Sequence, residues 1–459
     1  MGAIITLSVL GILVLYLGLF NSKSWLLPTT LFALVVALFF LISGWNQGGT
    51  PIYHGMILFD NFALIFSIVC IVITGLVLLL SKEYFSSISK NVAEYYCLIL
   101  FSLTGAIMVC SYHNFAMLFI GIEVMSVALY ILVGIRKTDF GSNEAALKYF
   151  LMGAFSTGFM LFGITLLYGA TGTFDISGVR GYLTANLDVS PLFYGGILLL
   201  LVGLLFKVGA APFHFWTPDV YDGAPILITT YMSTVVKVAS FAGFIKLFGY
   251  VFSPLQEFWT PVLLVIIVIT LFVGNITAMM QTSFKRMLAY SSISHAGYML
   301  FAIISLGAAA ESSILTYGFA YSLSSVAAFA GLILVKRNNG SDQFVAFDGL
   351  GSRNPFLAFV ISIAMLSLAG IPLTAGFIGK FMMFSNVMTD YHILLLILAV
   401  INAAIGVYYY LRVIVHMYFY SSTVSHKVAV PVNFNVVFIV TVLLTILIGV
   451  YPDIIINLL

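Results

Sequence analysis

The sequence predicts an all-α polytopic membrane protein with about fourteen transmembrane helices. Three observations lead to this class. Only 7% of the 459 residues are Asp, Glu, Lys or Arg, whereas roughly 25% are charged in an ordinary soluble domain. Hydrophobic residues make up 62% of the chain, more apolar surface than a soluble fold can hide. Runs of about 20 apolar residues, the length that crosses a bilayer as a helix, recur along the whole chain.

Fourteen such runs follow one another with short connections, so we expect one integral membrane domain over residues 1–459. The first run has neither a basic segment before it nor a cleavage site after it, and we interpret it as a retained span. The predicted spans are residues 2–20, 26–45, 56–80, 94–112, 114–135, 144–169, 191–213, 225–248, 258–280, 288–307, 312–335, 355–387, 391–419 and 433–456.

The basic residues of the predicted loops are divided very unequally between the two sides of the membrane. Twelve lie on one side and Arg180 alone lies on the other. Because cytoplasmic loops carry the excess of Lys and Arg, we expect the side with twelve to be cytoplasmic and both termini to be non-cytoplasmic. The twelve are Lys23, Lys82, Lys90, Arg136, Lys137, Lys148, Lys285, Arg286, Lys336, Arg337, Arg353 and Lys427.

Composition and motifs argue against several classes of function. A net charge of +2 without a basic stripe argues against a nucleic-acid partner. Cys70, Cys97 and Cys110 lie in apolar runs without CxxC spacing, so we expect buried thiols and no iron–sulfur cluster. The sequence has no metal-ligand spacing and no dinucleotide or P-loop motif, so we expect neither a metal nor a cofactor on this chain.

Four charged residues lie inside predicted spans: Glu123, Lys207, Lys237 and Lys380. Each would cost about 2.5–3.5 kcal/mol at the bilayer centre if it faced lipid, so we expect them to face protein or water. One interpretation is an internal ion pair that locks helices together. However, one carboxylate cannot neutralise three lysines, and an unpaired buried ammonium tends to lose its proton. We therefore predict that at least one lysine exchanges protons near neutral pH.

Two further basic residues lie nearer the ends of predicted helices. Lys246 is expected to extend its side chain to the membrane surface, as long basic side chains do. Arg412 has two open interpretations, since it can extend in the same way or join the polar interior.

Two histidines are candidates for proton transfer. His295, just inside span ten, either relays protons between the two halves or is satisfied by a backbone carbonyl, and both interpretations stay open. His214 lies at the mouth of span seven near Asp219 and Asp222, which suggests a hydrated access route. We interpret the remaining histidines as interfacial: His54, His113, His392, His416 and His426.

Two predicted spans contain helix-breaking residues beside their lysines. In span seven Lys207 precedes the break in LLFKVGAAPFHFW, and in span twelve Lys380 follows the break in LSLAGIPLTAGFIGK. Proline removes a backbone donor, and non-helical backbone at membrane depth is tolerated only where protein or water satisfies it. Interrupted spans in matching halves point to a transport site. We therefore expect helices 7 and 12 to be discontinuous.

The broken spans suggest an internal repeat. Span five contains SVALYIL and span ten contains SHAGYML, and these spans are five apart, as are spans seven and twelve. A repeat of five spans is odd, so the second copy must be inverted across the membrane. The expected division is three N-terminal spans over 1–93, two inverted five-helix repeats over 94–248 and 258–419, and a last span over 433–456.

Four segments carry a resemblance to a known family. They are FIGIEVMSVALYILVG, KVGAAPFHFWTPDVYDGAP, KRMLAYSSISHAGYM and LAGIPLTAGFIGKF. Over nearly its whole length the chain resembles the antiporter-like membrane subunits of bacterial respiratory complex I. The lysine at position 380, the short chain and the lack of a long lateral C-terminal helix make it most similar to the N type, rather than the M or L type.

This resemblance implies a proton-translocating subunit of NADH:quinone oxidoreductase in the bacterial inner membrane. It implies that Glu123 pairs with Lys207, that Lys237 relays, and that Lys380 releases protons outward. Quinone reduction elsewhere in the complex would open and close the Glu123–Lys207 pair. The implied partners are a neighbouring antiporter-like subunit, small membrane subunits and lipid, while FMN, iron–sulfur clusters and quinone would be held by other subunits.

Three alternatives are considered beside this interpretation. A cation/proton antiporter, alone or as part of a multi-subunit assembly, would share the fold and the charged axis, and purification without flavin and iron–sulfur signals would identify it. A structural subunit would only bridge its neighbours and seal the membrane. A quinone-binding catalytic subunit is disfavoured, because no sequence feature here forms a redox centre.

Overall fold

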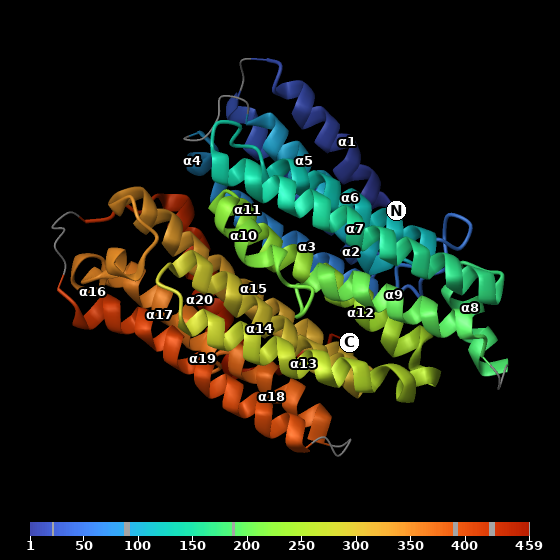
Figure 1. Cartoon of the computed structure of the whole chain (residues 1–459). Coiled ribbons are helices and arrows are strands. Elements are labelled where there is room, and N and C mark those ends of the chain that lie inside the picture. Colours follow the sequence, from blue (N-terminus) through green and yellow to red (C-terminus); the bar gives the residue numbers. More distant parts are fainter. Residues whose placement is uncertain (21–22, 87–91, 186–188, 389–392, 422–426, 459) are drawn as a thin grey trace.

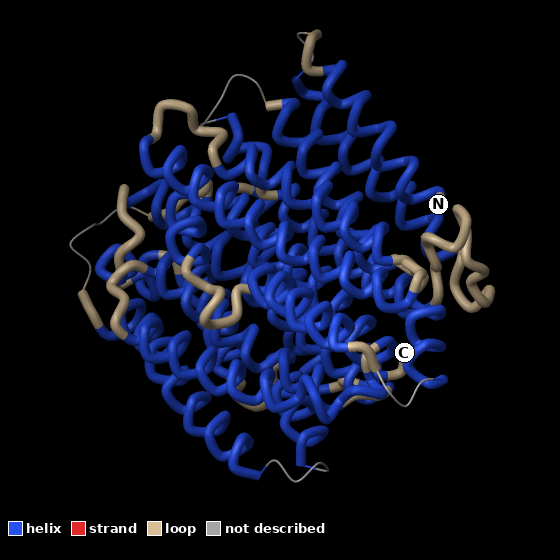
Figure 2. The backbone as a smooth tube through the Cα atoms, turned by 45° about the vertical axis from the view of Figure 1, so that its right-hand side comes forward, coloured by secondary structure: helices blue, strands red, loops and turns tan. Residues whose placement is uncertain are grey.

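The computed structural model of the chain describes residues 1–459 except 21–22, 87–91, 186–188, 389–392, 422–426 and 459. All regular secondary structure in this part of the chain is helical. The long helices run side by side in one bundle, and the two termini lie toward the same end of it in both views (Figures 1 and 2). An even number of membrane crossings requires this placement of the termini.

The described residues contain twelve helices that are long and apolar enough to cross a membrane, and two shorter apolar helices, Gly2–Leu17 and Pro355–Ala369. Together they confirm the fourteen predicted spans. The first half of the chain contains α1 (Gly2–Leu17), α2 (Leu26–Ser43), α3 (Asn61–Leu79), α4 (Ser81–Ser86), α5 (Ala93–Ser111), α6 (Phe115–Val133), α7 (Phe140–Thr171), α8 (Ile176–Ala185), α9 (Pro191–Val208), α10 (Trp216–Gly223), α11 (Ile226–Tyr231) and α12 (Lys237–Ile245).

The second half has the same character, with short helices between the long ones. It contains α13 (Gln256–Met279), α14 (Phe284–Ser305), α15 (Ala308–Asn339), α16 (Leu350–Arg353), α17 (Pro355–Ala369), α18 (Ala375–Met388), α19 (Ile393–Phe419), α20 (Val432–Val450) and α21 (Asp453–Ile456). Single 3₁₀ turns occur at Lys23–Trp25, Ser253–Leu255 and Phe344–Phe347, and π-helical segments at Met232–Val236 and Lys246–Val251. The prediction for 391–419 begins in residues outside the described part.

Polar side chains fix where several spans begin. Asp60 accepts a hydrogen bond from the Ala63 backbone at the start of α3, and Asn114 accepts one from Ala116 at the start of α6. Such caps satisfy backbone N–H groups that have no partner within the helix. The span predicted at 56–80 therefore starts later, at Asn61, because Asp60 is the cap.

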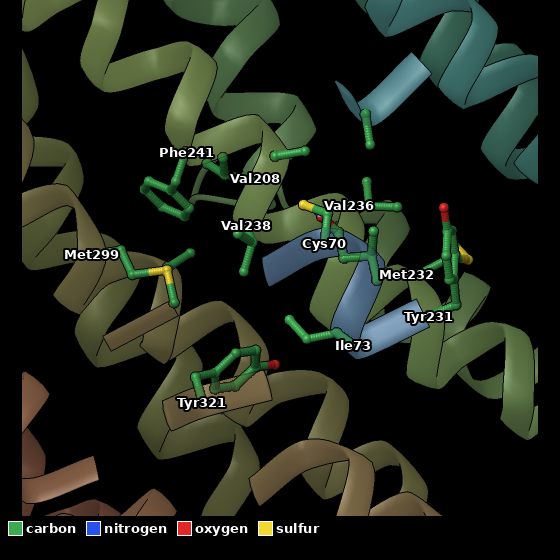
Figure 3. Close-up of a cluster of buried hydrophobic side chains, with 14 of the residues drawn as sticks. Cys70, Ile73, Val208, Tyr231, Met232, Val236, Val238, Phe241, Met299 and Tyr321 are labelled. Atoms are coloured by element: carbon green, nitrogen blue, oxygen red, sulfur yellow. Dashed lines mark hydrogen bonds between the residues drawn. The ribbon is translucent and has the colours of Figure 1, made fainter. Parts of the chain in front are cut away.

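The helices differ in how deeply they lie in the molecule. In α14 and α15, 94% of the most apolar 18-residue window is buried, against 33% in α7 and α19. The first pair is therefore central, and the second pair faces the surroundings. Apolar side chains pack around α12: Figure 3 shows Val208, Val236, Val238 and Phe241 in one cluster of buried hydrophobic residues.

The predicted lysine-rich loops meet at one end of the bundle, away from the termini. Arg337 pairs with Glu83 at 3.0 Å, and Lys336 pairs with Asp342 at 2.7 Å. The Arg136 guanidinium donates a hydrogen bond to the Tyr84 hydroxyl at 3.1 Å. The Arg337–Glu83 and Arg136–Tyr84 contacts join loops that are far apart in sequence, as the predicted topology requires.

Candidate functional site

Both predicted helix breaks are present. Helix α9 ends at Val208, Gly209 follows with φ +74°, and the chain becomes helical again at Trp216. Helix α17 ends at Ala369, Gly370 follows with φ +83°, and α18 begins at Ala375. A positive φ is readily adopted only by glycine, which explains the residue type at both ends. The structure thus confirms discontinuous helices 7 and 12.

Lys380 fills the break in helix 12. Its side chain is 6% exposed, and its Nζ donates hydrogen bonds to the backbone oxygens of Leu368 and Ala369, each at 2.9 Å. These carbonyls lie at the end of α17, where the break removes the N–H groups that would otherwise reach them. A positive charge is also favourable at the C-terminal end of a helix. The break and the lysine therefore form one unit.

Lys207 contacts the helix that carries Glu123, but not Glu123 itself. Its Nζ, in the last turn of α9, donates a hydrogen bond to the Ser126 hydroxyl on α6 at 2.6 Å. Ser126 lies one turn after Glu123, whose Oε1 is buried without a hydrogen-bond partner in the described part of the chain. The charge of Glu123 is near enough to act on Lys207. In this structure a serine hydroxyl therefore takes the place of the expected direct pair.

Lys237 begins α12, directly after a π-helical segment. It is 4% exposed, and its Nζ donates hydrogen bonds to the Ser292 hydroxyl at 2.5 Å and to the Ser292 backbone oxygen. The ammonium also lies 5.4 Å from the centre of the Tyr321 ring. Single π-helical turns often occur at functional sites. Here the π-helical segment ends directly before Lys237, whose side chain contacts α14.

His295 lies between Lys237 and Lys380, in a group of tyrosines. Its Nδ1 is 2.5 Å from the Tyr317 hydroxyl and its Nε2 is 2.8 Å from the Tyr410 hydroxyl. The imidazole is thus held by tyrosines, so the alternative of a backbone carbonyl is wrong. Its ring centre is also 4.8 Å from that of Tyr321.

Tyrosine rings join the two lysines to this histidine. Tyr321 contacts both Lys237 and His295. On the other side, Tyr298 lies 6.1 Å from His295, and the Lys380 ammonium lies 5.0 Å from the Tyr298 ring centre. These tyrosines are not among the site residues predicted from the sequence. One sequence feature could have indicated them, namely the i, i+4 spacing of Tyr317 and Tyr321, which places both on one face of an apolar span. Tyrosines in such spans are usually assigned to the core.

A static ion pair does not explain the axis. Among the described residues, no carboxylate oxygen lies within 4.0 Å of the Nζ of Lys207, Lys237 or Lys380. Each ammonium donates instead to hydroxyl or backbone oxygens. The interpretation of these residues as locked salt bridges is therefore not supported.

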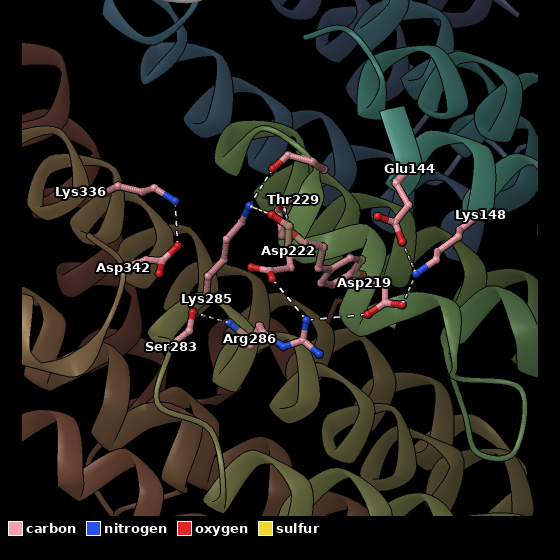
Figure 4. A network of polar contacts seen from close by, with 12 residues as sticks. Glu144, Lys148, Asp219, Asp222, Thr229, Ser283, Lys285, Arg286, Lys336 and Asp342 are labelled. Atoms are coloured by element: carbon pink, nitrogen blue, oxygen red, sulfur yellow. Dashed lines mark hydrogen bonds and ion pairs between the residues drawn. The ribbon is translucent and has the colours of Figure 1, made fainter. Parts of the chain in front are cut away.

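The lysine-rich end carries a dense network of ion pairs. Lys148 lies 2.8 Å from Glu144 and 2.7 Å from Asp219, and Arg286 lies 3.3 Å from Asp222 (Figure 4). Lys285 donates hydrogen bonds to the backbone oxygens of Asp222 and Ala224 at 2.5 and 2.7 Å. A polar cavity of about 420 Å³ opens here, lined by residues that include Arg136, Asp222, Lys285 and Lys336.

His214 lies outside that network. It is 8% exposed, stacks on Phe215, and does not line the polar cavity. Of the three residues around which an access route was predicted, Asp222 lines the cavity, whereas Asp219 and His214 do not, and the route itself stays a prediction.

The structure also places the two basic residues near the helix ends. It contradicts the prediction for Lys246 and decides between the two interpretations of Arg412. Lys246 does not extend to the surface: it is 9% exposed, and its Nζ lies 3.9 Å from Asp60. That prediction was wrong, because the Lys246 ammonium is buried beside the half-exposed Asp60 carboxylate and does not reach the surface itself. Arg412 donates hydrogen bonds to the backbone oxygens of Met279 and Gln281 at 3.2 and 2.9 Å, so it caps α13 and does not join the axis.

The remaining histidines lie away from the axis. His113 lies 3.6 Å from Asp175, and His416 lies 2.6 Å from Asp348. His392 and His426 are outside the described residues. Within the described part of the chain, no group of three or more His, Cys, Asp or Glu side chains is arranged to hold a metal ion.

Comparison with known proteins places the chain in one family. Residues 113–406 match the family model for NADH:quinone oxidoreductase/Mrp antiporter transmembrane subunits. The chain is 41% identical to NADH-quinone oxidoreductase subunit N of Cytophaga hutchinsonii over 459 residues, covering 100% of this chain and 99% of the relative. It is 42% identical to the subunit N of Trichlorobacter lovleyi over 420 residues, covering 90% and 86%.

Two solved structures share the fold of this chain. A chain of respiratory complex I from Thermus thermophilus superposes with a TM-score of 0.85 at 29% identity, covering 99% of this chain and 98% of that one. A chain of the archaeal membrane-bound sulfane sulfur reductase shares the fold, with a TM-score of 0.89 at 24% identity and coverage of 99% and 95%. With its fourteen spans and two interrupted helices, the chain belongs to the family of NADH:quinone oxidoreductase and Mrp antiporter membrane subunits.

Proposed function

We propose that the chain is the proton-translocating, N-type membrane subunit of an NADH:quinone oxidoreductase. Protons would move along Glu123, Lys207, Lys237 and Lys380 while quinone is reduced elsewhere in the complex. The observation that carries this proposal is the state of the three lysines, which are buried and donate their hydrogen bonds to hydroxyl and backbone oxygens, not to carboxylates. Buried ammonium groups without a carboxylate partner gain and lose protons readily, which a relay requires.

The coupling follows from the electrostatics of the Glu123–Lys207 pair. When a carboxylate comes within about 4 Å of an ammonium, the interaction is worth roughly 4 kcal/mol at an effective dielectric constant near 20. Ser126 stands between these groups in the open arrangement described above. Closing the pair would hold the proton on Lys207, and opening it would free the proton to move toward Lys237.

The second half of the path would use the tyrosine group. A proton on Lys237 would pass through water or hydroxyls near Tyr321 and His295 to Lys380, which would release it outward. His295 supports this order because both ring nitrogens already contact hydroxyls, and hydroxyls both accept and donate. Water would have to enter the apolar cluster that includes Val208 and Val238 for a proton to pass between Lys207 and Lys237.

The proposed setting is the bacterial inner membrane, with both termini on the non-cytoplasmic side. Other membrane subunits would cover the apolar faces of the chain, including a neighbouring antiporter-like subunit, small membrane subunits and lipid. Catalysis of NADH oxidation would belong to subunits that hold FMN and iron–sulfur clusters. The chain would contribute to the enzyme as its translocase and would bind no cofactor itself.

A cation/proton antiporter is the second candidate, because the matching family model covers both types of membrane subunit. The relatives that match over the full length of the chain favour the oxidoreductase, since they are subunits N of NADH-quinone oxidoreductase. Purification of the tagged chain from its native membrane separates the two: flavin and iron–sulfur absorption in the purified assembly supports the oxidoreductase, and their absence supports the antiporter.

The proposal is tested by replacing Lys207, Lys237 and Lys380 singly with Met in the intact complex. We expect each variant to translocate far fewer protons per NADH oxidised in sealed vesicles, while the complex still assembles. Lys137→Met is the matched control, because this lysine is exposed at the lysine-rich end. Wild-type proton translocation in all three axis variants would overturn the proposal.

A further inference from the structure

A second set of ionisable residues lies outside the axis, at the end of the bundle that carries the termini. Lys246 stands in the π-helical segment that ends the eighth span. Around it are Asp60 at the start of α3, Glu311 in the first turn of α15, and His113 just before α6. Four segments that are far apart in sequence thus bring ionisable groups to one place.

Lys246 is buried without a hydrogen bond. Its side chain is 9% exposed, and its Nζ has no hydrogen-bond partner among the described residues. Asp60 Oδ2 lies 3.9 Å away, and the centre of the Tyr112 ring lies 5.5 Å away. Hydrogen bonds of this type are about 2.7–3.2 Å long, so this is not the closed pair that a purely structural role would favour.

The carboxylates connect this ammonium to the surface. Asp60 Oδ1 accepts the capping hydrogen bond from Ala63 at 2.8 Å, which leaves Oδ2 free to face Lys246. The Asp60 side chain is 39% exposed, so the same group meets both the buried lysine and water. Glu311 is close enough to interact electrostatically with both Asp60 and Lys246.

His113 provides a further proton acceptor beside the cluster. Its Nε2 lies 3.6 Å from Asp175, whose side chain is 43% exposed, and its Nδ1 has no partner in the described part of the chain. Burial lowers the pKa of His113, which favours the neutral ring, and the neighbouring Asp175 carboxylate opposes this effect. Cys110 and Tyr112 complete the ionisable groups that face Lys246.

Lys246 shares one span with Lys237. The two residues are nine positions apart, which corresponds to roughly 13 Å along a helix of about 1.5 Å per residue. Nine residues are two and a half turns, so the two lysines face opposite sides: Lys237 meets α14, and Lys246 meets the ends of α3 and α5. The span therefore carries one ionisable group inside the axis and another near the surface.

We propose that Lys246 is a further proton-transfer residue of this subunit, which exchanges protons between the interior around the eighth span and the water at the end that carries the termini. The proton leaves the Lys246 ammonium for the Asp60 or Glu311 carboxylate, giving a neutral amine and a neutral carboxylic acid. The acid then releases the proton to water and regains its charge. This inference rests on the proposed function, because it needs protons to pass through the chain.

The test compares Lys246→Met with Lys246→Arg in the intact complex, measured as protons translocated per NADH oxidised in sealed vesicles. Arginine keeps the positive charge but cannot release its proton. We expect both variants to lose most of the translocation. Arg180→Met is the matched control, since Arg180 lies over the Tyr250 ring and not against the cluster, and it should translocate normally. Full translocation in Lys246→Arg would overturn the proposal, because a fixed charge would then suffice.

A second variant, Asp60→Asn, tests the same proposal if the lysine variants do not assemble. Asparagine caps helices as well as aspartate does, so α3 should still form while the carboxylate is lost. We expect this variant to assemble and to translocate fewer protons, and wild-type translocation would overturn the inference. If the axis variant Lys380→Met loses translocation while the Lys246 and Asp60 variants keep it, only the inference falls. If all of them keep it, the proposed function falls.

Discussion

At the scale of single residues, the axis lysines differ in what accepts their hydrogen bonds. Lys207 donates to a serine hydroxyl, Lys237 donates to both the hydroxyl and the backbone oxygen of Ser292, and Lys380 donates to two backbone oxygens. A hydroxyl can rotate and either accept or donate, whereas a backbone oxygen only accepts. Ser126 and Ser292 can therefore follow a change in the protonation of their lysines, while the Lys380 site stays fixed by the break in helix 12.

The tyrosines around His295 can be tested directly. In Tyr317→Phe and Tyr410→Phe, one ring nitrogen of His295 loses its hydroxyl partner and is left buried, which costs about 1–3 kcal/mol. We expect each change to slow proton translocation and the double change to slow it further. Translocation per NADH in sealed vesicles is the measurement.

The control for these variants is Tyr418→Phe, an exposed tyrosine on the same helix as Tyr410. It removes a hydroxyl without touching His295 and should translocate normally. If the double variant Tyr317→Phe/Tyr410→Phe equals the wild type, the tyrosine hydroxyls have no part in the path.

The sequence predicts the charged residues of the proposed axis but not the tyrosines, because the two residue types differ in what they cost inside a membrane. A lysine in an apolar span is expensive in lipid, so its position alone indicates an internal role. A tyrosine in a span costs little, and its role depends on which helices bring their hydroxyls together. Tyr317 and Tyr410 lie on α15 and α19, and only the packing of these helices against α14 brings them to His295.

At the scale of elements, the sequence predicts that a helix is broken, but it does not predict which side chain donates to the carbonyls that the break leaves free. The glycines and prolines of LSLAGIPLTAGFIGK predict the break in helix 12. They do not indicate that Lys380 reaches back to Leu368 and Ala369, since this requires α18 to fold against the end of α17. Lys246 shows the same limit. Its place near a helix end favoured a surface position, but the start of α3 brings Asp60 beside it.

The break itself can be tested through Gly370. Gly370 has φ +83°, and an added Cβ would lie 2.8 Å from Lys380 Cδ. Gly370→Ala therefore imposes a backbone cost of roughly 1–2 kcal/mol and also displaces the lysine from its carbonyls. We expect translocation per NADH to fall strongly in a complex that still assembles.

Gly340→Ala is the matched control for this prediction. Gly340 has φ +71° at the end of α15, and an added Cβ there would meet nothing within 4 Å. This variant has the same backbone cost without touching Lys380. Equal translocation in the two variants would show that the displacement of Lys380 has no consequence for the path.

At the scale of the whole molecule, the fourteen spans were predictable because each follows from its own apolar run. The distribution of basic loops was also predictable, and the structure gathers them at the end opposite the termini. The inverted repeats and the division at residues 93, 248, 258 and 419 stay predictions. One sequence shows only short similarities between its halves, which are too few to establish a repeat.

The orientation of the bundle in the membrane is the last prediction, and it follows from the charge of the two ends. With the lysine-rich end in the cytoplasm, Gln343 would face the cytoplasm, and Thr50, in the loop between α2 and α3, would face the opposite side. Both are exposed, and the native Cys70, Cys97 and Cys110 are buried, so single cysteines at these positions can be labelled selectively. A membrane-impermeant maleimide should label Thr50→Cys in spheroplasts and Gln343→Cys only in inverted vesicles. The reverse pattern would place the termini in the cytoplasm and reverse the direction of proton movement along the axis.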